Sequence, residues 1–282
     1  MNKDFYKLGI IGYPLSHSIS PAIQTAALHS VKLYGSYEKF EVAENELKSQ
    51  IDYLRENDYS GFNVTIPHKI NIIKFLDELD ETAQRIGAVN TVKINPDGTL
   101  QGYNTDITGF INSILNNDCT SKNFKNAKLL GCGGAALAVI FGLEKLGCEN
   151  LIISVRNIEK TNAFLEQLKN KTTIKFKIED INNQSTLENV DILINSTPLG
   201  TKGTNENSMP TTRELLKSAN KNILIYDLVY NPLQTMLLKT ATDLKLSSMN
   251  GLDMLIYQGA EAFKIWTNKT PAIDLMKEAV IL

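Results

Sequence analysis

The sequence is short of cysteine, of net charge and of long apolar runs, and each shortage excludes a class of protein. Its three cysteines, Cys119, Cys132 and Cys148, form no Cys-x-x-Cys pair, so we expect neither a disulfide framework nor a structural zinc site. The formal net charge is −2, so no basic field draws the chain to nucleic acid or to an anionic membrane. No stretch approaches the roughly 18 consecutive apolar residues of a membrane-spanning helix.

Several functional motifs are also missing. The N-terminal residues 1–5 contain no apolar segment of the kind that a signal peptide carries, so we expect a cytoplasmic protein. The three histidines, His17, His29 and His68, lack the spacing of metal ligands, and we expect no metal site. No Gly-x-Ser-x-Gly elbow is present, and no Gly-Lys-Ser/Thr follows the glycine-rich loop, which argues against a hydrolase or a P-loop protein.

What is present is the composition and pattern of a two-domain α/β protein. The 282 residues are 43% hydrophobic and 21% charged, as in a globular chain of two ordinary domains. Short apolar runs alternate with helical patterns, and this alternation predicts doubly wound, largely parallel sheets. Strands are predicted over residues 8–12, 37–42, 61–65, 88–94, 100–103, 127–130, 151–155, 191–195 and 223–227. Helices are predicted over residues 20–33, 44–57, 69–86, 108–115, from the glycine-rich loop to 147, 158–168, and twice after residue 252 with a break near Pro271.

The glycine-rich loop follows one of these buried strands. Gly131, Gly133 and Ala136 match Gly-x-Gly-x-x-Gly/Ala, and the loop opens a helix within a strand–helix–strand unit. The first glycine allows the tight turn, the second lets the backbone approach a pyrophosphate, and the alanine is small enough for close packing. The N–H groups of the helix start can bind phosphate. This context favours a dinucleotide site over a turn that only packs.

The end of the next strand indicates which dinucleotide binds. An NAD site usually carries an acidic residue there, to bind the ribose 2′-hydroxyl, but this strand ends in Val155-Arg156-Asn157. An arginine can pair with a 2′-phosphate through a forked, charge-assisted contact. The pattern therefore favours NADP(H), with a solvated Arg156 as the alternative.

Polar residues of the first domain stand at strand ends and helix starts. Ser18 and Ser20 are two apart, so in an extended stretch both hydroxyls point the same way; alternatively, Ser20 caps the helix that Pro21 begins. Lys69 follows a buried strand, where a lysine is most often a solvated surface residue, and Asp106 stands where the two domains join. A Lys/Asp pair in a closed site could transfer a proton to or from a hydroxyl or a ketone.

Taken together, these segments resemble the shikimate dehydrogenase family over nearly the whole chain. Two segments depart slightly from the family pattern: Val155-Arg156-Asn157 stands where Asn-Arg-Thr is frequent, and Asn195-Ser196-Thr197 where Asn-Ala-Thr is usual. The motifs that carry the resemblance are Ser18-Ile19-Ser20-Pro21, Asn63-Val64-Thr65-Ile66-Pro67-His68-Lys69, Gly87-Ala88-Val89-Asn90-Thr91, Gly102-Tyr103-Asn104-Thr105-Asp106, Asn195-Ser196-Thr197-Pro198-Leu199-Gly200, Tyr226-Asp227-Leu228-Val229-Tyr230-Asn231-Pro232 and Gly251-Leu252-Asp253-Met254-Leu255-Ile256-Tyr257-Gln258.

The resemblance implies a fold and a reaction. The fold is a substrate domain of residues 1–106, completed by C-terminal helices of residues 252–282, and a Rossmann-like NADP-binding domain of residues 107–251. The reaction is the reversible, NADPH-dependent reduction of 3-dehydroshikimate to shikimate, a step of aromatic amino-acid biosynthesis. The partner is thus a small molecule, with no nucleic acid and no membrane, and the enzyme is a monomer or a homodimer.

The resemblance also implies the role of individual residues. Lys69 and Asp106 are the expected catalytic pair. The carboxylate ligands are expected to be Ser18, Ser20 and Tyr230, and the contacts to the ring hydroxyls Asn63, Thr65, Asn90 and Gln258. The cofactor is expected to contact Gly131, Gly133, Gly134, Ala135, Arg156, Thr197, Leu228 and Gly251.

Two other functions remain open at this stage. A quinate/shikimate dehydrogenase that uses NAD would share the fold, although serines at positions 18 and 20 suit shikimate, because the extra hydroxyl of quinate needs room beside the carboxylate. A ligand sensor that binds such compounds without turnover belongs to another class of protein. The presence of Lys69, Asp106 and the glycine-rich loop argues against the sensor.

Overall fold

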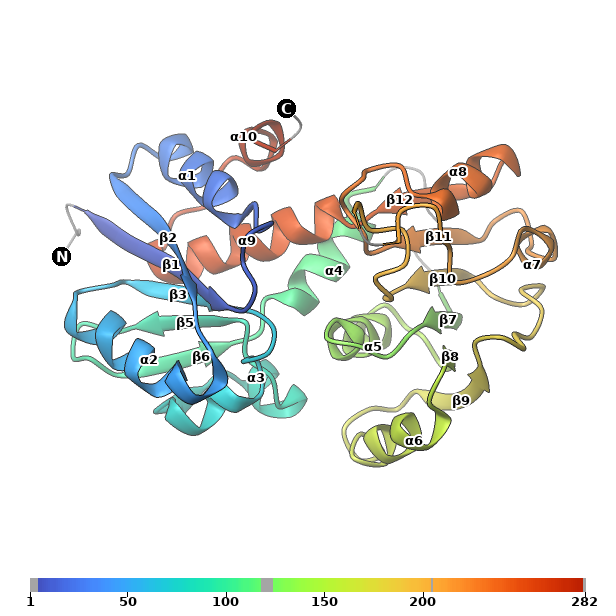
Figure 1. Cartoon of the computed structure of the whole chain (residues 1–282), viewed down its shortest axis with the longest axis horizontal. Helices are drawn as coiled ribbons and strands as arrows, with labels where there is room; N and C mark the ends of the chain where they lie inside the picture. Colours follow the sequence, from blue (N-terminus) through green and yellow to red (C-terminus); the bar gives the residue numbers. More distant parts are fainter. Residues whose placement is uncertain (1–4, 118–123, 204, 281–282) are drawn as a thin grey trace. The chain divides into compact units, whose positions relative to one another are not determined.

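The computed structural model describes residues 5–117, 124–203 and 205–280; Cys119 and the first four residues lie outside this range. The chain forms two compact units, shown in Figure 1. Unit 1 contains Met1–Gly109 and Ile256–Leu282, so it is built from both ends of the chain. Unit 2 is the continuous segment Phe110–Leu255. Both units are α/β structures.

Unit 1 is built around a mixed six-stranded sheet with the order β2-β1-β3-β5-β6-β4. β1, β2 and β3 are mutually parallel, β5 is antiparallel to β3 and to β6, and β4 runs parallel to β6. The carboxyl ends of β1, β3 and β6 and the start of β5 therefore lie at one edge of the sheet. The strands are β1 (Tyr6–Gly12), β2 (Gly35–Glu41), β3 (Gly61–Val64), β4 (Glu78–Leu79), β5 (Thr91–Ile94) and β6 (Leu100–Tyr103).

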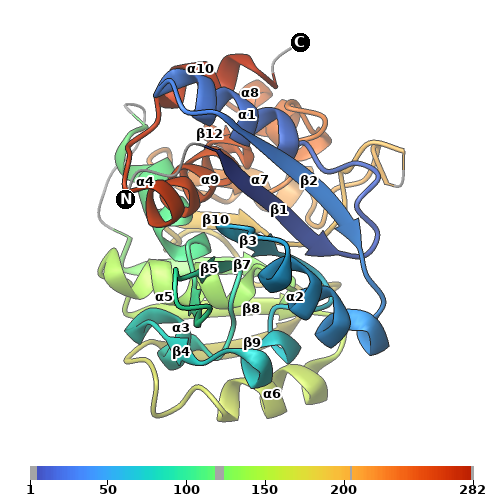
Figure 2. The same cartoon turned by 90° about the vertical axis from the view of Figure 1, so that its left-hand side faces the viewer.

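Helices cover this sheet. Their segments are α1 (Ser20–Ser30), η1 (Glu44–Glu46), α2 (Leu47–Glu56), η2 (Asn71–Phe75), α3 (Glu81–Ile86), α9 (Leu252–Thr267, mostly in unit 1) and α10 (Ile273–Glu278), where η marks a 3-10 helix. Figure 2 shows α10 beside α1, although about 250 residues separate them in sequence.

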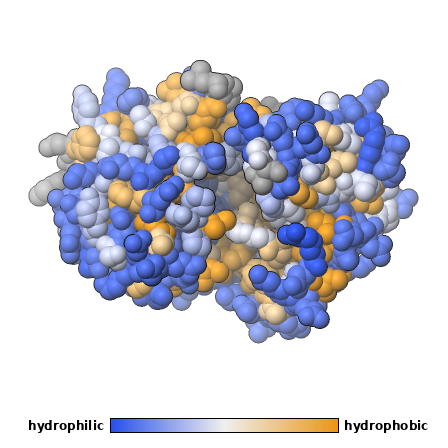
Figure 3. All heavy atoms as spheres, viewed as in Figure 1, coloured by the Kyte–Doolittle hydropathy of each residue, from blue (hydrophilic) through white to orange (hydrophobic). Residues whose placement is uncertain are grey.

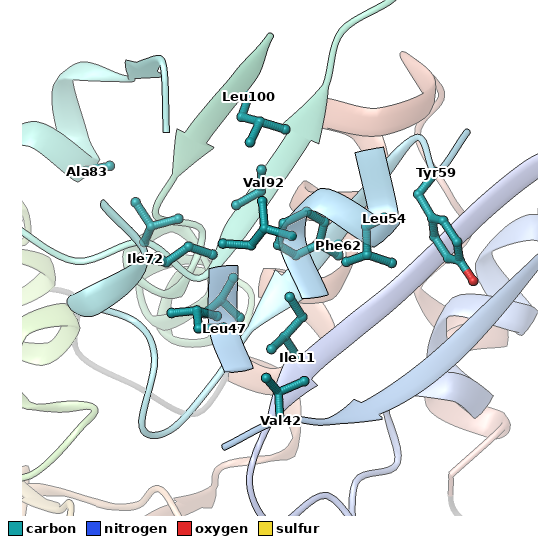
Figure 4. Close-up of a cluster of buried hydrophobic side chains, with 13 residues drawn as sticks. Ile11, Val42, Leu47, Leu54, Tyr59, Phe62, Ile72, Ala83, Val92 and Leu100 are labelled. Carbon is teal, nitrogen blue, oxygen red and sulfur yellow. The ribbon is translucent and has the colours of Figure 1, made fainter. Parts of the chain in front are cut away.

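The core of unit 1 follows from the alternation of side chains along β1. Leu8 and Ile10 pack with Trp266 of α9, while Ile11 faces the cluster beneath α2. Figure 4 shows this second cluster, in which Leu47 and Leu54 of α2 lie over Ile11 and its neighbours in the sheet. Both faces of the sheet are therefore buried, and its edge is left to carry polar groups.

Unit 2 has a six-stranded, wholly parallel sheet with the order β12-β11-β10-β7-β8-β9. Numbered within the unit, this is the Rossmann order 3-2-1-4-5-6, in which the direction of winding reverses between β7 and β10. The strands are β7 (Asn126–Leu130), β8 (Asn150–Val155), β9 (Lys175–Asp180), β10 (Ile192–Asn195), β11 (Leu224–Asp227) and β12 (Ser247–Asn250). The helices are α4 (Asp106–Leu115, mostly in unit 2), α5 (Ala136–Lys145), α6 (Ile158–Glu166), α7 (Arg213–Lys217) and α8 (Met236–Asp243).

Every strand predicted from the sequence is present, to within a few residues at its ends. The helix predicted over residues 69–86 is wrong. The segment instead forms η2, the short strand β4 and α3, because the backbone at Asp77 pairs with Leu100 of β6 and the Asp80 side chain caps α3. The helix predicted over residues 20–33 ends at Ser30, and Gly35 begins β2.

Five elements were not predicted from the sequence. They are β4, β9, β12, α7 and α8, and all of them have eight residues or fewer.

Figure 3 shows hydrophilic residues spread over the visible face of each unit. Within residues 5–117, 124–203 and 205–280, no helix is long and apolar enough to cross a membrane.

Candidate active site

The polar residues predicted in unit 1 meet at one edge of its sheet. Ser18 and Ser20 follow β1, Lys69 follows β3, Asn90 immediately precedes β5, and Asp106 follows β6. Because β5 runs antiparallel to its neighbours, its start lies beside the ends of β3 and β6. The strand directions therefore gather residues that are up to 88 positions apart in sequence.

Lys69 and Asp106 form the central contact of this edge. The Lys69 Nζ donates to Asp106 Oδ2 at 2.6 Å, and the two side chains are 21% and 14% exposed. Asp106 is the first residue of α4, where the helix dipole favours a carboxylate. The backbone carbonyl of Lys69 accepts from the N–H of Val89 at 2.8 Å, which ties the lysine to the approach to β5. The pair is held in place yet open to a ligand.

Asn90 holds the carboxylate from its other side. Its Nδ2 donates to Asp106 Oδ1 at 2.8 Å and to Thr105 Oγ1 at 2.9 Å, and its Oδ1 accepts from the N–H of Thr105 at 2.7 Å. Gln258 of α9 approaches the same Nδ2 with its Oε1, at 3.4 Å. Asn90 is 3% exposed, and both ends of its amide are engaged. Its main effect is therefore to fix the direction of Asp106.

Asn63 and Thr65 lie on either side of the end of β3. The Asn63 Nδ2 donates to Asn90 O and to Thr91 Oγ1, both at 3.1 Å, so both amide hydrogens are used. Thr65 is partly exposed, and its N–H donates to Ile11 O at 2.9 Å. A side chain at Gly12 would collide with Thr65, so the glycine is needed where the end of β1 crosses this position.

The start of α1 brings the two serines to the same edge. The alternative of Ser20 as the helix N-cap is wrong, because the cap position is Ile19 and Ser20 is already the first helical residue. The N–H of Ser20 donates to Ser18 Oγ at 3.4 Å, and both serines are partly exposed. Gln24 of α1 donates from Nε2 to Gly259 O at 2.9 Å, which ties α1 to the helix that carries Gln258.

In unit 2 the glycine-rich loop lies at the reversal point of the sheet. Gly131 has φ +88°, a conformation that favours glycine, and a Cβ there would come within 2.7 Å of Thr197 Cγ2 after β10. A Cβ at Gly133 would meet only Ser196 O, at 3.9 Å, so the space beside this residue is open. Ala136 is fully buried at the start of α5. The open space at Gly133 and the N–H groups at the start of α5 could hold a pyrophosphate.

The other residues predicted to bind the cofactor follow neighbouring strands of the same sheet. Arg156 follows β8 and is exposed, and the next residue, Asn157, caps α6 by accepting from Lys160 N at 2.8 Å. Leu228 and Gly251 follow β11 and β12 and lie so close that a Cβ at Gly251 would collide with the Leu228 backbone. The carboxyl edge of the parallel sheet thus gathers them around the loop.

Three models of one protein family match most of the chain. Residues 10–92 match "Shikimate dehydrogenase substrate binding domain", residues 114–232 match "Shikimate / quinate 5-dehydrogenase", and residues 251–281 match "Shikimate 5'-dehydrogenase C-terminal domain". A protein of Methanocaldococcus jannaschii named "Shikimate dehydrogenase (NADP(+))" is 43% identical over 276 residues, which cover 97% of this chain and 95% of the relative.

The chain belongs to the shikimate dehydrogenase family. Solved structures of the family agree with the fold. A crystal structure of a shikimate dehydrogenase in complex with NADP+ has a TM-score of 0.89 and 42% identity, and covers 100% of this chain and 96% of the other. A shikimate dehydrogenase of Thermus thermophilus in complex with NADP(H) and shikimate has a TM-score of 0.84 and 33% identity, with coverage of 97% and 98%.

Some residues that hold the side chains of the site in place were not identified from the sequence. Thr91 and Thr105 hold the amides of Asn63 and Asn90, and they could have been found as neighbours within the quoted motifs. In unit 2 the buried carboxylate of Asp227 accepts from Asn195 Nδ2 at 2.9 Å and from Thr235 Oγ1 at 2.6 Å. Burial raises the pKa of Asp227, while these hydrogen bonds oppose that change.

Tyr230, predicted to bind substrate, belongs to unit 2. Burial raises the pKa of its phenol, which keeps it neutral and able to donate. Within the described residues, no group of three or more His, Cys, Asp and Glu side chains is placed to hold a metal ion.

Proposed function

We propose that the protein catalyses the reversible reduction of 3-dehydroshikimate to shikimate, with NADPH as the reductant. The observation that carries this proposal is the Lys69–Asp106 contact of 2.6 Å, which lies among serine, threonine and asparagine side chains at the open edge of the sheet in unit 1. Family membership supplies the substrate class, and the pair supplies the means of moving a proton.

Lys69 is the proton donor in the direction of reduction. As a ketone accepts a hydride, negative charge develops on its oxygen, and a nearby ammonium both stabilises that charge and delivers the proton. An ammonium has three N–H groups, so the bond to Asp106 leaves others for the substrate oxygen. In the direction of oxidation, the neutral amine of Lys69 takes the proton back from the hydroxyl.

Asp106 holds Lys69 in line for this transfer. One carboxylate oxygen accepts from Lys69, and the other accepts from Asn90 at 2.8 Å, so the carboxylate cannot turn without breaking a hydrogen bond. Positioning of this kind is a large part of catalysis, because the reacting atoms then need no further ordering. Asn90 acts through Asp106 in this scheme, and the contact to a ring hydroxyl that is expected for it stays a prediction.

The remaining residues bind the substrate. Ser18, Ser20 and Tyr230 are proposed to bind the carboxylate, and Asn63, Thr65 and Gln258 the ring hydroxyls. A site of this type discriminates well, because a ligand that lacks the matching hydroxyl leaves buried polar groups without partners.

NADP(H) is the cofactor, and bound NADPH supplies the hydride. Gly131, Gly133, Gly134 and Ala135 are proposed to hold its pyrophosphate at the start of α5, and Arg156 its 2′-phosphate. Further contacts are proposed from Thr197, Leu228 and Gly251. The proposal also places the enzyme in the cytoplasm, as a monomer or a homodimer. Light scattering during gel filtration tests the oligomeric state.

The proposal is tested by turnover of purified protein, followed at the absorbance band of reduced nicotinamide. Shikimate and quinate are each supplied with NADP+ and with NAD+, which gives four assays. We expect turnover of shikimate with NADP+ far above the other three. Dominant turnover of quinate, or a preference for NAD+, would move the protein to the quinate branch of the family, and binding of shikimate without any turnover would support a sensor.

A further inference from the structure

Tyr37 contacts one of the proposed substrate residues, Asn63, from a position outside the site. It lies on β2, opposite Leu8 of β1, and it is 8% exposed. Its ring packs among Leu8 and Ile10 and lies 6.4 Å from the Trp266 ring, centre to centre. The phenol therefore reaches across β1 from a fixed ring.

The hydroxyl of Tyr37 bonds to Asn63. It donates to Asn63 Oδ1 at 2.7 Å, and both groups are buried. A phenol has one hydrogen, and Tyr37 gives it to Asn63. Burial raises the pKa of this phenol, so it stays protonated and able to donate. The geometry therefore fixes one directed hydrogen bond, from Tyr37 to Asn63.

The amide of Asn63 has only one orientation in this setting. Its Nδ2 donates to Asn90 O and to Thr91 Oγ1, and a backbone carbonyl such as Asn90 O is an acceptor only. Turning the amide over would bring two carbonyl oxygens together. With both amide hydrogens used and one lone pair of Oδ1 given to Tyr37, a single lone pair of Oδ1 is left for a ligand.

We propose that Tyr37 is a positioning residue: by donating to Oδ1 of Asn63, whose amide the Asn90 carbonyl already orients, it leaves that oxygen a single lone pair, so that the site selects a ligand with a hydroxyl, and rejects a carbonyl or carboxylate oxygen, at that point. This inference rests on the proposed function, because it concerns the same substrate site. Tyr37 itself touches neither substrate nor cofactor. Its effect reaches the ligand through Asn63.

The test compares Tyr37→Phe with Tyr59→Phe. Phenylalanine keeps the ring packing and removes only the hydroxyl. Tyr59 is the matched control: it is a 4% exposed tyrosine of unit 1 whose hydroxyl donates to Glu38 at 2.9 Å. KM and kcat for shikimate, KM for NADP+ and the unfolding temperature are measured for each variant, together with the Kd for shikimate by calorimetry.

We expect Tyr37→Phe to raise KM and Kd for shikimate by about 10-fold, the size of one well-placed hydrogen bond, with kcat within about threefold and KM for NADP+ unchanged. Tyr59→Phe should change none of these. A KM for shikimate within about twofold of the wild type would overturn the inference. So would parallel changes in kcat, both KM values and the unfolding temperature, since these indicate a structural role only.

A second variant tests the route through Asn63. In an Asn63→Ala background, Tyr37→Phe should change Kd for shikimate by less than about twofold, because the group that it positions is gone. A full 10-fold effect in that background would overturn the inference. Wild-type protein that binds shikimate without turnover would overturn the proposed function alone, since the Kd comparison still decides the role of Tyr37. Wild-type protein that does not bind shikimate would overturn both.

Discussion

At the scale of single residues, the role of a polar side chain in this protein depends on which of its atoms the fold leaves free. Asn63 and Asn90 are both buried asparagines at the same sheet edge, yet their amides are engaged differently. The Nδ2 of Asn90 donates to Asp106 and Thr105, whereas the Oδ1 of Asn63 accepts one hydrogen bond and has one lone pair left. The same residue type thus orients the Asp106 carboxylate at one position and, at the other, keeps an acceptor for the proposed substrate.

Arg156 gives the first prediction at this scale. If its guanidinium pairs with the 2′-phosphate, Arg156→Ala should raise the Kd for NADPH by about 10- to 100-fold. The Kd for NADH should change by less than about twofold, because NADH has no 2′-phosphate. Binding is measured by nicotinamide fluorescence. Arg213→Ala is the control, since Arg213 is an exposed arginine of unit 2 that pairs with Asp243 at 3.0 Å. Equal losses for both cofactors would show that Arg156 does not read the 2′-phosphate.

Cys132, in the glycine-rich loop, gives a prediction about pH. Burial raises the pKa of its thiol to about 11, so below that pH the thiol stays protonated and is a poor nucleophile. Alkylation by iodoacetamide should therefore be slow at pH 8 and accelerate as the pH rises toward 11. NADP+ should protect Cys132 further if the loop holds the cofactor. The rate is followed by mass spectrometry of the peptide in a Cys119→Ser background.

Cys148 is the internal reference for this experiment. Burial also raises the pKa of its thiol to about 11, but the residue lies between α5 and β8, away from the loop. NADP+ should leave its alkylation unchanged. Rapid alkylation of Cys132 at pH 7, or equal protection of both cysteines, would contradict this account of the loop.

At this scale the sequence could predict which residues gather but not how they bond. Lys69 and Asp106 could be named as a pair from their motifs, and the structure joins them at 2.6 Å. The part of Tyr37 could not be predicted, because it depends on strand register: the phenol passes over β1 to reach Asn63 on β3. Nothing in the local sequence around Tyr37 indicates that its hydroxyl bonds to a residue of the proposed site.

At the scale of elements, prediction succeeded for buried strands and failed where pairing between distant segments decides. The apolar runs of β1, β7 and β8 identify these strands on sight. Residues 69–86 have a helical pattern, but β4 forms within them because β6 offers a partner for Glu78 and Leu79. A partner 23 residues away in sequence is invisible to a local pattern.

A buried ion pair ties three strands of unit 2 together. Lys128 of β7 is fully buried, and its Nζ lies 2.7 Å from Glu179 Oε1 of β9, which also accepts from Ser154 of β8 at 2.7 Å. Burial lowers the pKa of Lys128. Burial alone would raise the pKa of Glu179, but hydrogen bonds from Lys128, Ser185 and Ser154 outweigh it and lower that pKa.

Breaking this pair should destabilise the sheet. Lys128→Met leaves the Glu179 carboxylate buried without its cation, and we expect a loss of about 3–5 kcal/mol in the free energy of unfolding. Because the folded pKa of Glu179 is lowered, its contribution is present above the unfolded value of roughly 4.3 and is lost as the pH falls through the folded pKa. Glu179→Gln should therefore lose less stability between pH 7 and pH 3 than the wild type does.

Both effects are measured by urea unfolding. Lys125→Met is the control: Lys125 pairs with Glu149 at 3.5 Å on the surface, with both side chains 62% exposed, and its loss should cost less than about 1 kcal/mol. A Lys128→Met variant as stable as Lys125→Met would contradict the account of the buried pair. An acid profile of Glu179→Gln that matches the wild type would do the same for the pKa argument.

At the scale of the whole molecule, the proposed catalytic pair and the glycine-rich loop lie on two different sheets. The mixed sheet of unit 1 turns β5 against its neighbours, and this brings Asn90 to the edge that carries Lys69 and Asp106. The parallel sheet of unit 2 reverses its winding beside Gly131. The α/β class was predictable from the alternation of patterns. The mixed direction of the first sheet was not, because a hairpin of the size of β5–β6 fits several sheet orders.

The proposed reaction depends above all on Lys69, which would move the proton in an NADP-linked reduction of a ketone. The most direct measurement compares shikimate oxidation by the wild type, Lys69→Ala, Lys69→Arg and Lys74→Ala, with the Kd for shikimate taken in parallel. Lys74 is an exposed lysine of η2 that lies over Phe75 and serves as the control.

We expect Lys69→Ala to lower kcat by about 10²–10⁴ with Kd little changed. Lys69→Arg should not restore kcat, because a guanidinium keeps the charge but does not release its proton. Lys74→Ala should behave as the wild type does. Activity of Lys69→Ala within a few-fold of the wild type would contradict the account.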